Sequence, residues 1–282
     1  SNLGFVRGNN AGIRATPAEN DVVLLNNDVE ILHESWLERL QRAATSAPNV
    51  GIAGCRLVLG DGRLLHAGTY IRPDTMWGQQ IGSLEIDLDQ YAGTREVEGI
   101  VFACAYLRRE TLDRVGLLSE DYQSYFEDTE YCLRAKEAGY VTVCAGDVTL
   151  RHDEHGSTSG HDEARRELFE RSRSVFRAKW GAALERRYTW KLHWQSVTNF
   201  PSGYAMSARE MLRELDNAGV RLTYEYAYGR GTPLPFDEPE AGGDHIIDLI
   251  RSRPAPKRPP IAVTYAQGDV FHRNPGRIRI GF

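Results

Sequence analysis

The sequence predicts an α/β protein built from two units, each with strands and helices in alternation. In residues 1–158, short apolar runs alternate with stretches whose apolar residues recur at helical spacing. One long amphipathic stretch covers 161–187, and a second strand–helix–strand series begins near residue 189. Alternation of this kind favours mostly parallel, doubly wound sheets of the Rossmann-like type. A length of 282 residues suits one large domain or two ordinary ones.

The composition excludes several classes of protein. Hydrophobic residues make up 41% of the chain and charged residues 26%, as is typical of globular domains. The net charge of −5 gives no general attraction to nucleic acid or to an anionic membrane. Apolar runs stay far below the ~20 residues needed to cross a bilayer, so no transmembrane segment is expected. We expect a cytoplasmic protein, or one held peripherally at the inner face of a membrane.

The cysteines predict a reduced interior. The chain has four of them, at positions 55, 104, 132 and 144, each in an apolar strand-like or helical context. Their scattered positions provide neither a disulfide framework nor a CxxC metal pair. We therefore expect buried, free thiols.

The first unit begins its regular structure with a short apolar strand at 22–25. A helix is predicted over 33–47, where Trp36, Leu37 and Leu40 lie at helical spacing. The sequence Gly60-Asp61-Gly62 separates two strand-like runs and predicts a hairpin.

Two glycines are expected to end helices later in this unit. Residues 99–116 predict a buried strand that leads into a short helix ending at Gly116. Residues 127–140 predict a second helix that stops at Gly139, and a strand follows it.

The second unit follows the long helix predicted over 161–187. That helix has Phe169, Phe176 and Trp180 near one face. Strand-like patterns at 192–199 and 221–226 then flank a helical one, which indicates a second, partial Rossmann-like unit.

The residues Asn26, Asn27 and Asp28 stand at the end of the first apolar strand. Asn and Asp favour turns because their side chains bond the local backbone, so a plain turn is one interpretation. The other is a metal site, because open α/β sheets bind ligands at the carboxyl ends of their strands. The three residues alone leave both interpretations open.

Another acidic pair, Glu127 and Asp128, opens a predicted helix. One interpretation makes Asp128 an N-cap, because a carboxylate there accepts bonds from free amide groups and meets the helix dipole favourably. The other is a catalytic base, which a desolvated carboxylate can become when its pKa is raised.

Four motifs together resemble glycosyltransferase family 2. They are "GFVRGNNAGI", "VVLLNNDVEI", "GIVFACAYLRRETLDRVGLLSEDYQSYFEDTEYCLRAKEAGY" and "VTLRHDEHGSTSG", in the family's order and over roughly residues 3–185. The resemblance implies a GT-A fold whose first strands are missing here. It also implies inverting transfer, of hexosyltransferase type, from a nucleotide-diphosphate sugar to a glycan, a lipid-linked acceptor or another hydroxyl.

The resemblance implies roles for particular residues. Asp28 would bind a divalent cation, magnesium or manganese, with Asn26 as a weaker amide ligand and Asn27 beside them. Asp128 would be the catalytic base, with Glu127 as its substitute.

Histidines after the last strand of the first unit are further candidates. His152 matches the family's histidine and would contact the metal or the diphosphate, and Glu154 and His155 lie close to it in the sequence. A structural role is the alternative for each.

The segment around Asn10 is the last candidate. Arg7, Gly8 and Asn10 match the stretch that lies near the nucleotide in the family, so the resemblance makes Asn10 a donor-binding candidate. A Gly-Asn turn is the alternative.

The end of the chain resembles the start of a GT-B domain like that of glycosyltransferase family 4. The expected organisation is therefore the C-terminal part of a GT-A domain at 1–158, a connecting helix at 159–188 and the beginning of a GT-B-like domain at 189–282. Both ends look cut, as in a fragment of a longer, bifunctional glycosyltransferase of polysaccharide biosynthesis. Two other functions stay open, a nucleotidyltransferase on the same sheet and a non-catalytic scaffold module.

Overall fold

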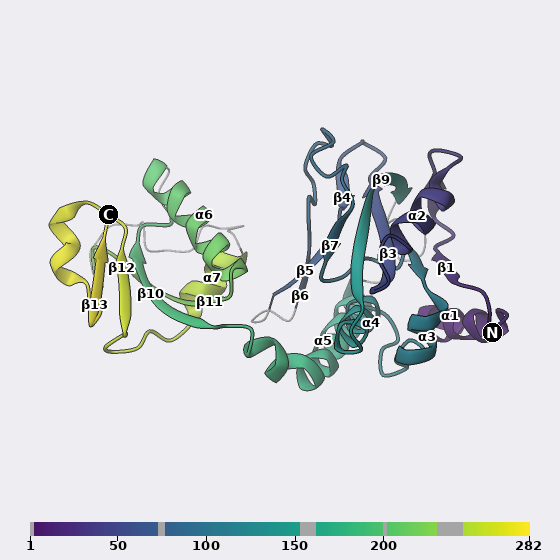
Figure 1. Cartoon of the computed structure of the whole chain (residues 1–282). Helices are drawn as coiled ribbons and strands as arrows, with labels where there is room; N and C mark the ends of the chain where they lie inside the picture. The colour runs from purple at the N-terminus through teal and green to yellow at the C-terminus, as the bar shows by residue number, and fades with distance from the viewer. Residues whose placement is uncertain (1–2, 73–76, 153–161, 200–201, 230–244) are drawn as a thin grey trace. The chain divides into compact units, whose positions relative to one another are not determined.

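The chain forms two compact units in a computed structural model, Ser1–Gly181 and Ala182–Phe282 (Figure 1). The structure describes residues 3–72, 77–152, 162–199, 202–229 and 245–282. The division between the units falls inside the last turn of a long helix, α5 (Asp162–Glu185).

Unit 1 is built on a seven-stranded sheet. Its main path runs β1 (Val22–Leu25), β8 (Cys104–Leu107), β3 (Val50–Val58), β9 (Val141–His152) and β2 (Val29–Ile31). Two further strands leave this path, because β4 (Leu64–His66) pairs with β3 and β7 (Arg95–Val97) pairs with β9.

The prediction of a mostly parallel sheet is wrong for the described part of unit 1. Only β3 and β9 pair in parallel there, and the other pairs are antiparallel. The strands β1, β3 and β9, which helices separate in the sequence, do share one direction. The alternation predicted this common direction, but it gave no sign that β8 inserts antiparallel between β1 and β3.

The described residues of unit 1 include four more helices, namely α1 (Gly4–Ala15), α2 (Trp36–Ala44), α3 (Arg109–Val115) and α4 (Glu127–Glu137). The Gly-Asn turn considered near residue 8 is wrong, because Val6, Asn10 and Ile13 recur at helical spacing and are buried along α1. Gly116 and Gly139 end α3 and α4 with positive φ angles, as predicted.

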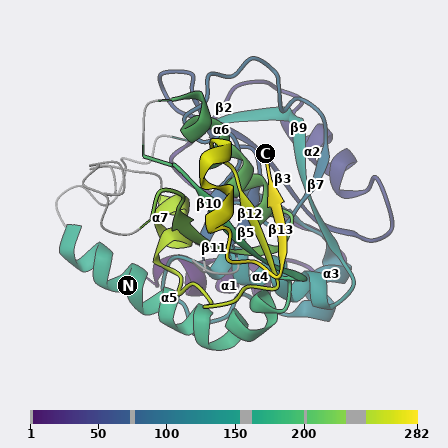
Figure 2. The ribbon, with the colours of Figure 1, turned by 90° about the vertical axis from the view of Figure 1, so that its left-hand side faces the viewer.

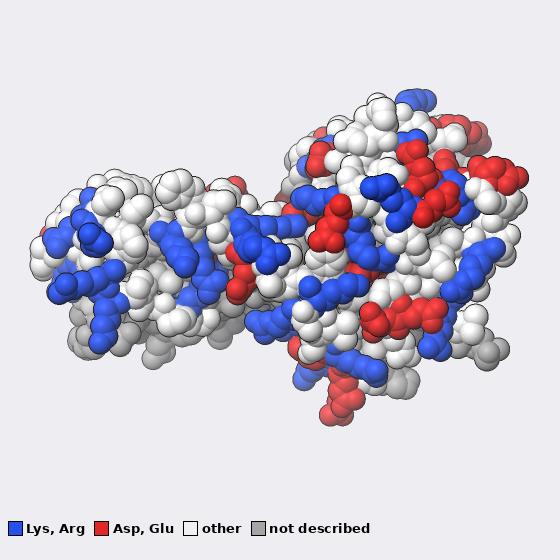
Figure 3. Space-filling model, turned by 60° about the horizontal axis from the view of Figure 1, so that its bottom comes forward, with Lys and Arg blue, Asp and Glu red and all other residues white. Residues whose placement is uncertain are grey.

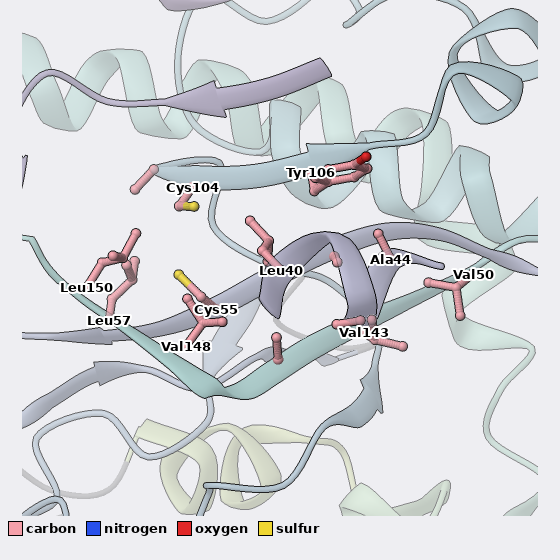
Figure 4. Close-up of a cluster of buried hydrophobic side chains, with 14 residues drawn as sticks. Leu40, Ala44, Val50, Cys55, Leu57, Cys104, Tyr106, Val143, Val148 and Leu150 are labelled. Carbon is pink, nitrogen blue, oxygen red and sulfur yellow. The ribbon is translucent and has the colours of Figure 1, made fainter. Parts of the chain in front are cut away.

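One core cluster of unit 1 lies between the sheet and α2. Leu40 of α2 is fully buried and belongs to one cluster with Leu57, Ala145 and Leu150 of the sheet. Cys55 and Cys104 are members of the same cluster (Figure 4). Burial of each large apolar side chain stabilises the fold by about 1.5–3 kcal/mol. All four cysteines are free and buried, which confirms that prediction.

One hairpin belongs to this sheet, and another forms a separate two-stranded sheet. The predicted hairpin at Gly60-Asp61-Gly62 connects β3 to β4, and Gly62 takes a positive φ of 84°. The second, β5 (Thr69–Arg72) with β6 (Trp77–Gln80), was not predicted, because its strands have no regular apolar alternation.

Unit 2 contains an entirely parallel four-stranded sheet among its described residues. The order is β11 (Val220–Tyr226), β10 (Trp190–Ser196), β12 (Ile261–Thr264) and β13 (Ile278–Gly281), and Figure 2 shows β10, β12 and β13 side by side. The connections contain α6 (Gly203–Asn217), α7 (His245–Ser252) and the 3-10 helix η2 (Gly268–Arg273). Trp194, Leu212, Leu222 and Ile250 form a separate buried core.

Acidic and basic side chains are interspersed on the face of unit 1 in Figure 3. Among the described helices, none combines the length and the apolar character that spanning a bilayer requires.

Candidate active site

A cleft of about 470 Å³ opens in unit 1 at the start of α4. Residues from four segments line it: Asn26 after β1, Gly78 and Gln80 of β6, Val101 to Ala103 before β8, and Ser124 to Thr129 at the start of α4, together with Phe5 and Phe169. The carboxyl end of β1 and the beginning of α4 thus share one concave surface. The structure brings together Asn26, Glu127 and Asp128, which the sequence singled out.

The chain enters α4 through a strained turn. Tyr125 and Phe126 have φ angles of 68° and 69°, a left-handed conformation that costs a non-glycine residue about 1–2 kcal/mol. Ring contacts with α5 hold this turn, since Phe126 lies 5.3 Å from Phe169 and 5.1 Å from Phe176 between ring centroids. The strained conformation directs the two following carboxyl groups toward the cleft that they line.

Glu127 is a buried acid without a full set of partners. Its side chain is 7% exposed, and its Oε2 has no hydrogen-bond partner among the described residues. Burial raises the pKa of Glu127 to about 8, and the negative charge of Asp128 contributes to the rise. Glu127 therefore holds a proton at neutral pH.

Asp128 has better partners for its charge. Its Oδ1 accepts bonds from the backbone N–H of Thr129 at 2.6 Å and from the Thr129 hydroxyl at 3.2 Å. Burial raises the pKa of Asp128, and the bonds from Thr129 oppose that rise. The N-cap interpretation is wrong, because Phe126 occupies the N-cap position and α4 begins at Glu127.

The Asn26–Asp28 segment divides between two places. The backbone N–H of Asn26 donates to the carbonyl of Ala103 at 2.9 Å, which fixes Asn26 at the cleft. Asn27 is exposed, and Asp28 is half-buried.

Asp28 lies beside His152 because of the register between β2 and β9. Val29 is paired with His152, so the preceding residue reaches the imidazole, and Oδ1 of Asp28 lies 3.2 Å from Nε2 of His152. The Nδ1 atom of His152 is buried and has no partner in the part of the chain that the structure describes. Neither Asp28 nor His152 is among the residues that line the cleft.

This pair fits a divalent cation in part. A carboxylate with an imidazole suits manganese, which accepts mixed oxygen and nitrogen ligands, better than magnesium. Across the described ranges, however, no group of three His, Cys, Asp or Glu side chains is arranged to hold an ion. Glu154 and His155 lie outside the described residues.

Asn10 lies away from the cleft. Its side chain is 1% exposed and bridges α1 to the segment after α3, because its amide donates to the carbonyl of Leu118 at 2.9 Å and accepts from the Leu118 N–H at 3.0 Å. Both of its polar atoms therefore serve this link.

The sequence did not single out Gln80, which also lines the cleft. Its strand, β6, carries no motif and no apolar alternation, so only the fold reveals its position. Phe169, which the sequence placed on one face of the long helix, lines the cleft together with Tyr125 and Phe126.

Comparison with known proteins finds relatives of parts of the chain. The O-antigen biosynthesis protein RfbC of Myxococcus xanthus is 32% identical over 141 residues, 48% of this chain. An uncharacterized protein of Sinorhizobium fredii, y4gI, is 31% identical over 182 residues, 61% of this chain. The low-salt glycan biosynthesis hexosyltransferase Agl10 of Haloferax volcanii is 26% identical over 138 residues, 48% of this chain.

These relatives are longer than the matched regions, which span 11%, 19% and 44% of RfbC, y4gI and Agl10. No protein-family model matches the chain. Among solved structures, GalNAc-T7 with UDP, GalNAc and Mn²⁺ aligns with a TM-score of 0.48 at 11% identity, over 76% of this chain and 42% of that one.

Proposed function

We propose that unit 1 is an inverting glycosyltransferase that transfers a sugar from a nucleotide-diphosphate sugar to a hydroxyl of a glycan or lipid-linked acceptor. One observation carries the proposal, namely that Glu127, Asp128 and Asn26 meet on a single cleft at the carboxyl end of a strand. The names of two relatives support it, since one is an O-antigen biosynthesis protein and the other a hexosyltransferase of glycan biosynthesis.

The two carboxyl groups take different roles in this proposal. Because Glu127 has a pKa of about 8, it is the protonated member of the pair at neutral pH. Asp128 is then the ionised member, stabilised by its bonds from Thr129, and it is free to accept a proton. This assignment makes Asp128 the base, with Glu127 as its neutral neighbour.

The proposed transfer is a single displacement. The acceptor oxygen forms a bond to the anomeric carbon while the bond from that carbon to the diphosphate oxygen breaks. The acceptor proton passes to Asp128, and the nucleoside diphosphate leaves. Attack from the face opposite the leaving group inverts the anomeric configuration.

Asp28 and His152 would hold a divalent cation, and Asn26 stands just before Asp28 in the sequence. When bound, such a cation neutralises the negative charge that develops on a diphosphate leaving group. The role of this chain's residues is to hold the acidic side chain and the imidazole close together, which the pairing of β2 with β9 achieves.

We also propose that residues 189–282 are the beginning of a GT-B-like domain. In this proposal residues 1–158 are the C-terminal part of a GT-A domain, and residues 159–188 form the helix that connects the two. The parallel order of the described strands in 189–282 supports this assignment.

The test compares two isosteric variants, Asp128→Asn and Glu127→Gln. Turnover is measured as release of nucleoside diphosphate from a panel of UDP-, GDP- and dTDP-sugars with glycan acceptors. Asp128→Asn should lower kcat by roughly 10²–10⁴-fold, the range of a lost general base, and leave donor binding intact. Glu127→Gln imitates the protonated acid and should retain most of the activity at pH 7.

Three outcomes would contradict this proposal. If the Asp128→Asn variant turns over normally, Asp128 is not the base. Release of pyrophosphate from a nucleoside triphosphate and a sugar phosphate identifies a nucleotidyltransferase instead. A chain that binds no nucleotide sugar and releases no nucleoside diphosphate is a scaffold module.

A further inference from the structure

A buried histidine stands behind the cleft at the end of β4. His66 is 1% exposed, and its Nε2 accepts hydrogen bonds from two backbone N–H groups, that of Gly68 at 3.2 Å and that of Val101 at 3.4 Å. A backbone N–H can only donate, so Nε2 carries no proton. The imidazole is neutral, because burial lowers the pKa of His66 to about 4.

The proton of the neutral ring is therefore on Nδ1. This atom donates to Oε1 of Gln80, and the hydroxyl of Thr69 donates to the same oxygen at 3.2 Å. Two donors on one side of the amide define which end is oxygen and which is nitrogen. The orientation of the Gln80 side chain follows from the backbone bonds to His66.

The amide nitrogen of Gln80 is consequently the end that remains for the cleft. Gln80 lines the cleft together with Glu127 and Asp128, and no described residue accepts a bond from its Nε2. Among the described residues, its two N–H groups have no acceptor. They lie in a site whose two nearby carboxyl groups act mainly as acceptors.

We infer that Gln80 is a specificity-determining residue, which donates from Nε2 to a sugar hydroxyl in the cleft, with His66 as the residue that positions it. This inference deepens the proposed function and rests on it for the class of ligand. The contact joins a fixed protein donor to a substrate oxygen, so it discriminates between sugars by the presence and position of one hydroxyl.

The surroundings of Gln80 favour a sugar over an anion. Ionised Asp128 would repel a phosphate placed between it and Gln80, whereas a hydroxyl can accept from the amide and donate to a carboxylate. The rings of Tyr125 and Phe126 line the same cleft and provide apolar surface for the C–H groups of a pyranose. A ligand that lacks the required hydroxyl leaves the amide donor unpaired, which sites of this kind reject strongly.

The first experiment tests the orientation without any ligand. Nitrogen-15 chemical shifts of the His66 ring, measured between pH 5.5 and 8.5, should show the Nδ1–H tautomer throughout. The Nε2–H tautomer, or an imidazolium in this range, would overturn the inference. This result does not depend on whether the chain is a glycosyltransferase.

The second experiment tests the contact in the whole chain. The side-chain amide resonance of Gln80 is assigned by its loss in Gln80→Leu, and methyl glycosides of glucose, galactose, mannose and N-acetylglucosamine are then titrated in. At least one should shift this resonance, while the amide of Gln79, which is exposed on the same strand, stays unchanged. If no sugar of the panel moves the Gln80 amide, the inference is wrong.

The kinetic arm separates this inference from the proposed function. Gln80→Leu should lower kcat/KM for the preferred sugar by about 10–100-fold. It should also reduce the ratio of kcat/KM between that sugar and the deoxy sugar that lacks the contacted hydroxyl. The control variant Gln79→Leu should change neither value. Nucleotide-sugar turnover that is unaffected by Gln80→Leu refutes the inference and leaves the proposed function standing, whereas a shifted Gln80 amide without any turnover refutes the proposed function alone.

Discussion

Glu127 and Asp128 are neighbours in the sequence, yet their surroundings differ. Glu127 has an oxygen without a partner among the described residues and a pKa of about 8, while Asp128 accepts two bonds from Thr129. Environments that separate the protonation states of two acids are a common arrangement in enzyme active sites. The same difference has a consequence for stability.

Stability should fall with rising pH because of Glu127. Its pKa is raised from an ordinary 4.5 to about 8, so the folded chain holds this proton more tightly than the unfolded chain. The stabilisation is fully present below pH 4.5 and is lost as the pH rises through about 8. Glu127→Gln keeps the side chain neutral at both pH values. The free energy of unfolding of this variant, relative to that of the original chain, should be about 2–4 kcal/mol higher at pH 9 than at pH 5.

Urea denaturation at both pH values measures this difference. The matched control is Glu137→Gln, at an exposed position of the same helix. Equal stabilities of Glu127→Gln and the original chain at pH 9 would mean that Glu127 is ionised in the folded state without penalty.

The sequence identified part of the candidate site. The polar residues after β1 could be found because amide and acidic side chains directly follow an apolar segment. Those at the start of α4 could be found because two acidic side chains open a segment of helical periodicity. Gln80 could not be found, since nothing in the sequence of β6 distinguishes it from exposed Gln79. Its role depends on which way the hairpin faces, and a one-residue change of register would exchange the two side chains.

The helix α4 is anchored at its middle by a buried acid. Glu130 is fully buried and forms ion pairs with Arg134, four residues on, and with Lys179 of α5. Arg134 also donates to the carbonyls of Val115 and Leu117 at 2.8 Å, which ties α4 to the end of α3. This cluster holds the helix whose first turn carries Glu127.

Arg134→Met should destabilise unit 1 by about 3–5 kcal/mol, because a buried carboxylate would lose one of its two cations and two carbonyls would lose a donor. Lys136→Met is the control on the same helix. Lys136 is exposed and lies 3.8 Å from Glu98, so its loss should cost less than about 0.5 kcal/mol. Similar values for the two variants in chemical denaturation would argue against the cluster as an anchor.

A glycine in β9 permits close contact with the segment before β7. The register between β3 and β9 shifts after the pair Cys55 and Ala145, which leaves a bulge that includes Gly146. A Cβ atom at Gly146 would overlap the backbone carbonyl oxygens of Tyr91 and Gly93.

Gly146→Ala should therefore cost about 2–4 kcal/mol, since backbone atoms cannot move aside as a flexible side chain can. Gly93→Ala is the control from the same contact, because a Cβ at Gly93 meets no atom within 4 Å. Thermal unfolding of both variants decides the matter, and equal melting temperatures would contradict the close approach.

At this scale the sequence predicted helices better than it predicted strand pairing. α2, α3 and α4 appear close to where apolar periodicity and terminal glycines placed them. β2, β5, β6 and β7 are strands of three or four residues that lack the unbroken apolar run by which β1 was predicted. α1 was missed because Gly and Asn are weak helix formers, and its buried stripe of Val6, Asn10 and Ile13 outweighs their preference.

Over the whole molecule, each unit has a core of its own. Leu57 belongs to the cluster of unit 1 and is 1% exposed, and Leu212 belongs to the cluster of unit 2 and is fully buried. Two cores with separate membership favour two separate unfolding transitions.

Leu57→Ala and Leu212→Ala should each cost about 2–5 kcal/mol in the unit that contains them. Differential scanning calorimetry should show that each substitution lowers the temperature of a different transition. A single transition that both variants lower equally would show that the two cores unfold together.

The insertion of β8 between β1 and β3 also determines when unit 1 can assemble on the ribosome. β1 pairs with β8, which lies about eighty residues later in the chain, and β2 pairs with the C-terminal end of β9. The early strands therefore leave the exit tunnel without their partners, and pairings of such long sequence separation form slowly. Until His152 has emerged, the nascent chain displays apolar segments to the surrounding cell, which makes it a natural client for chaperones during translation.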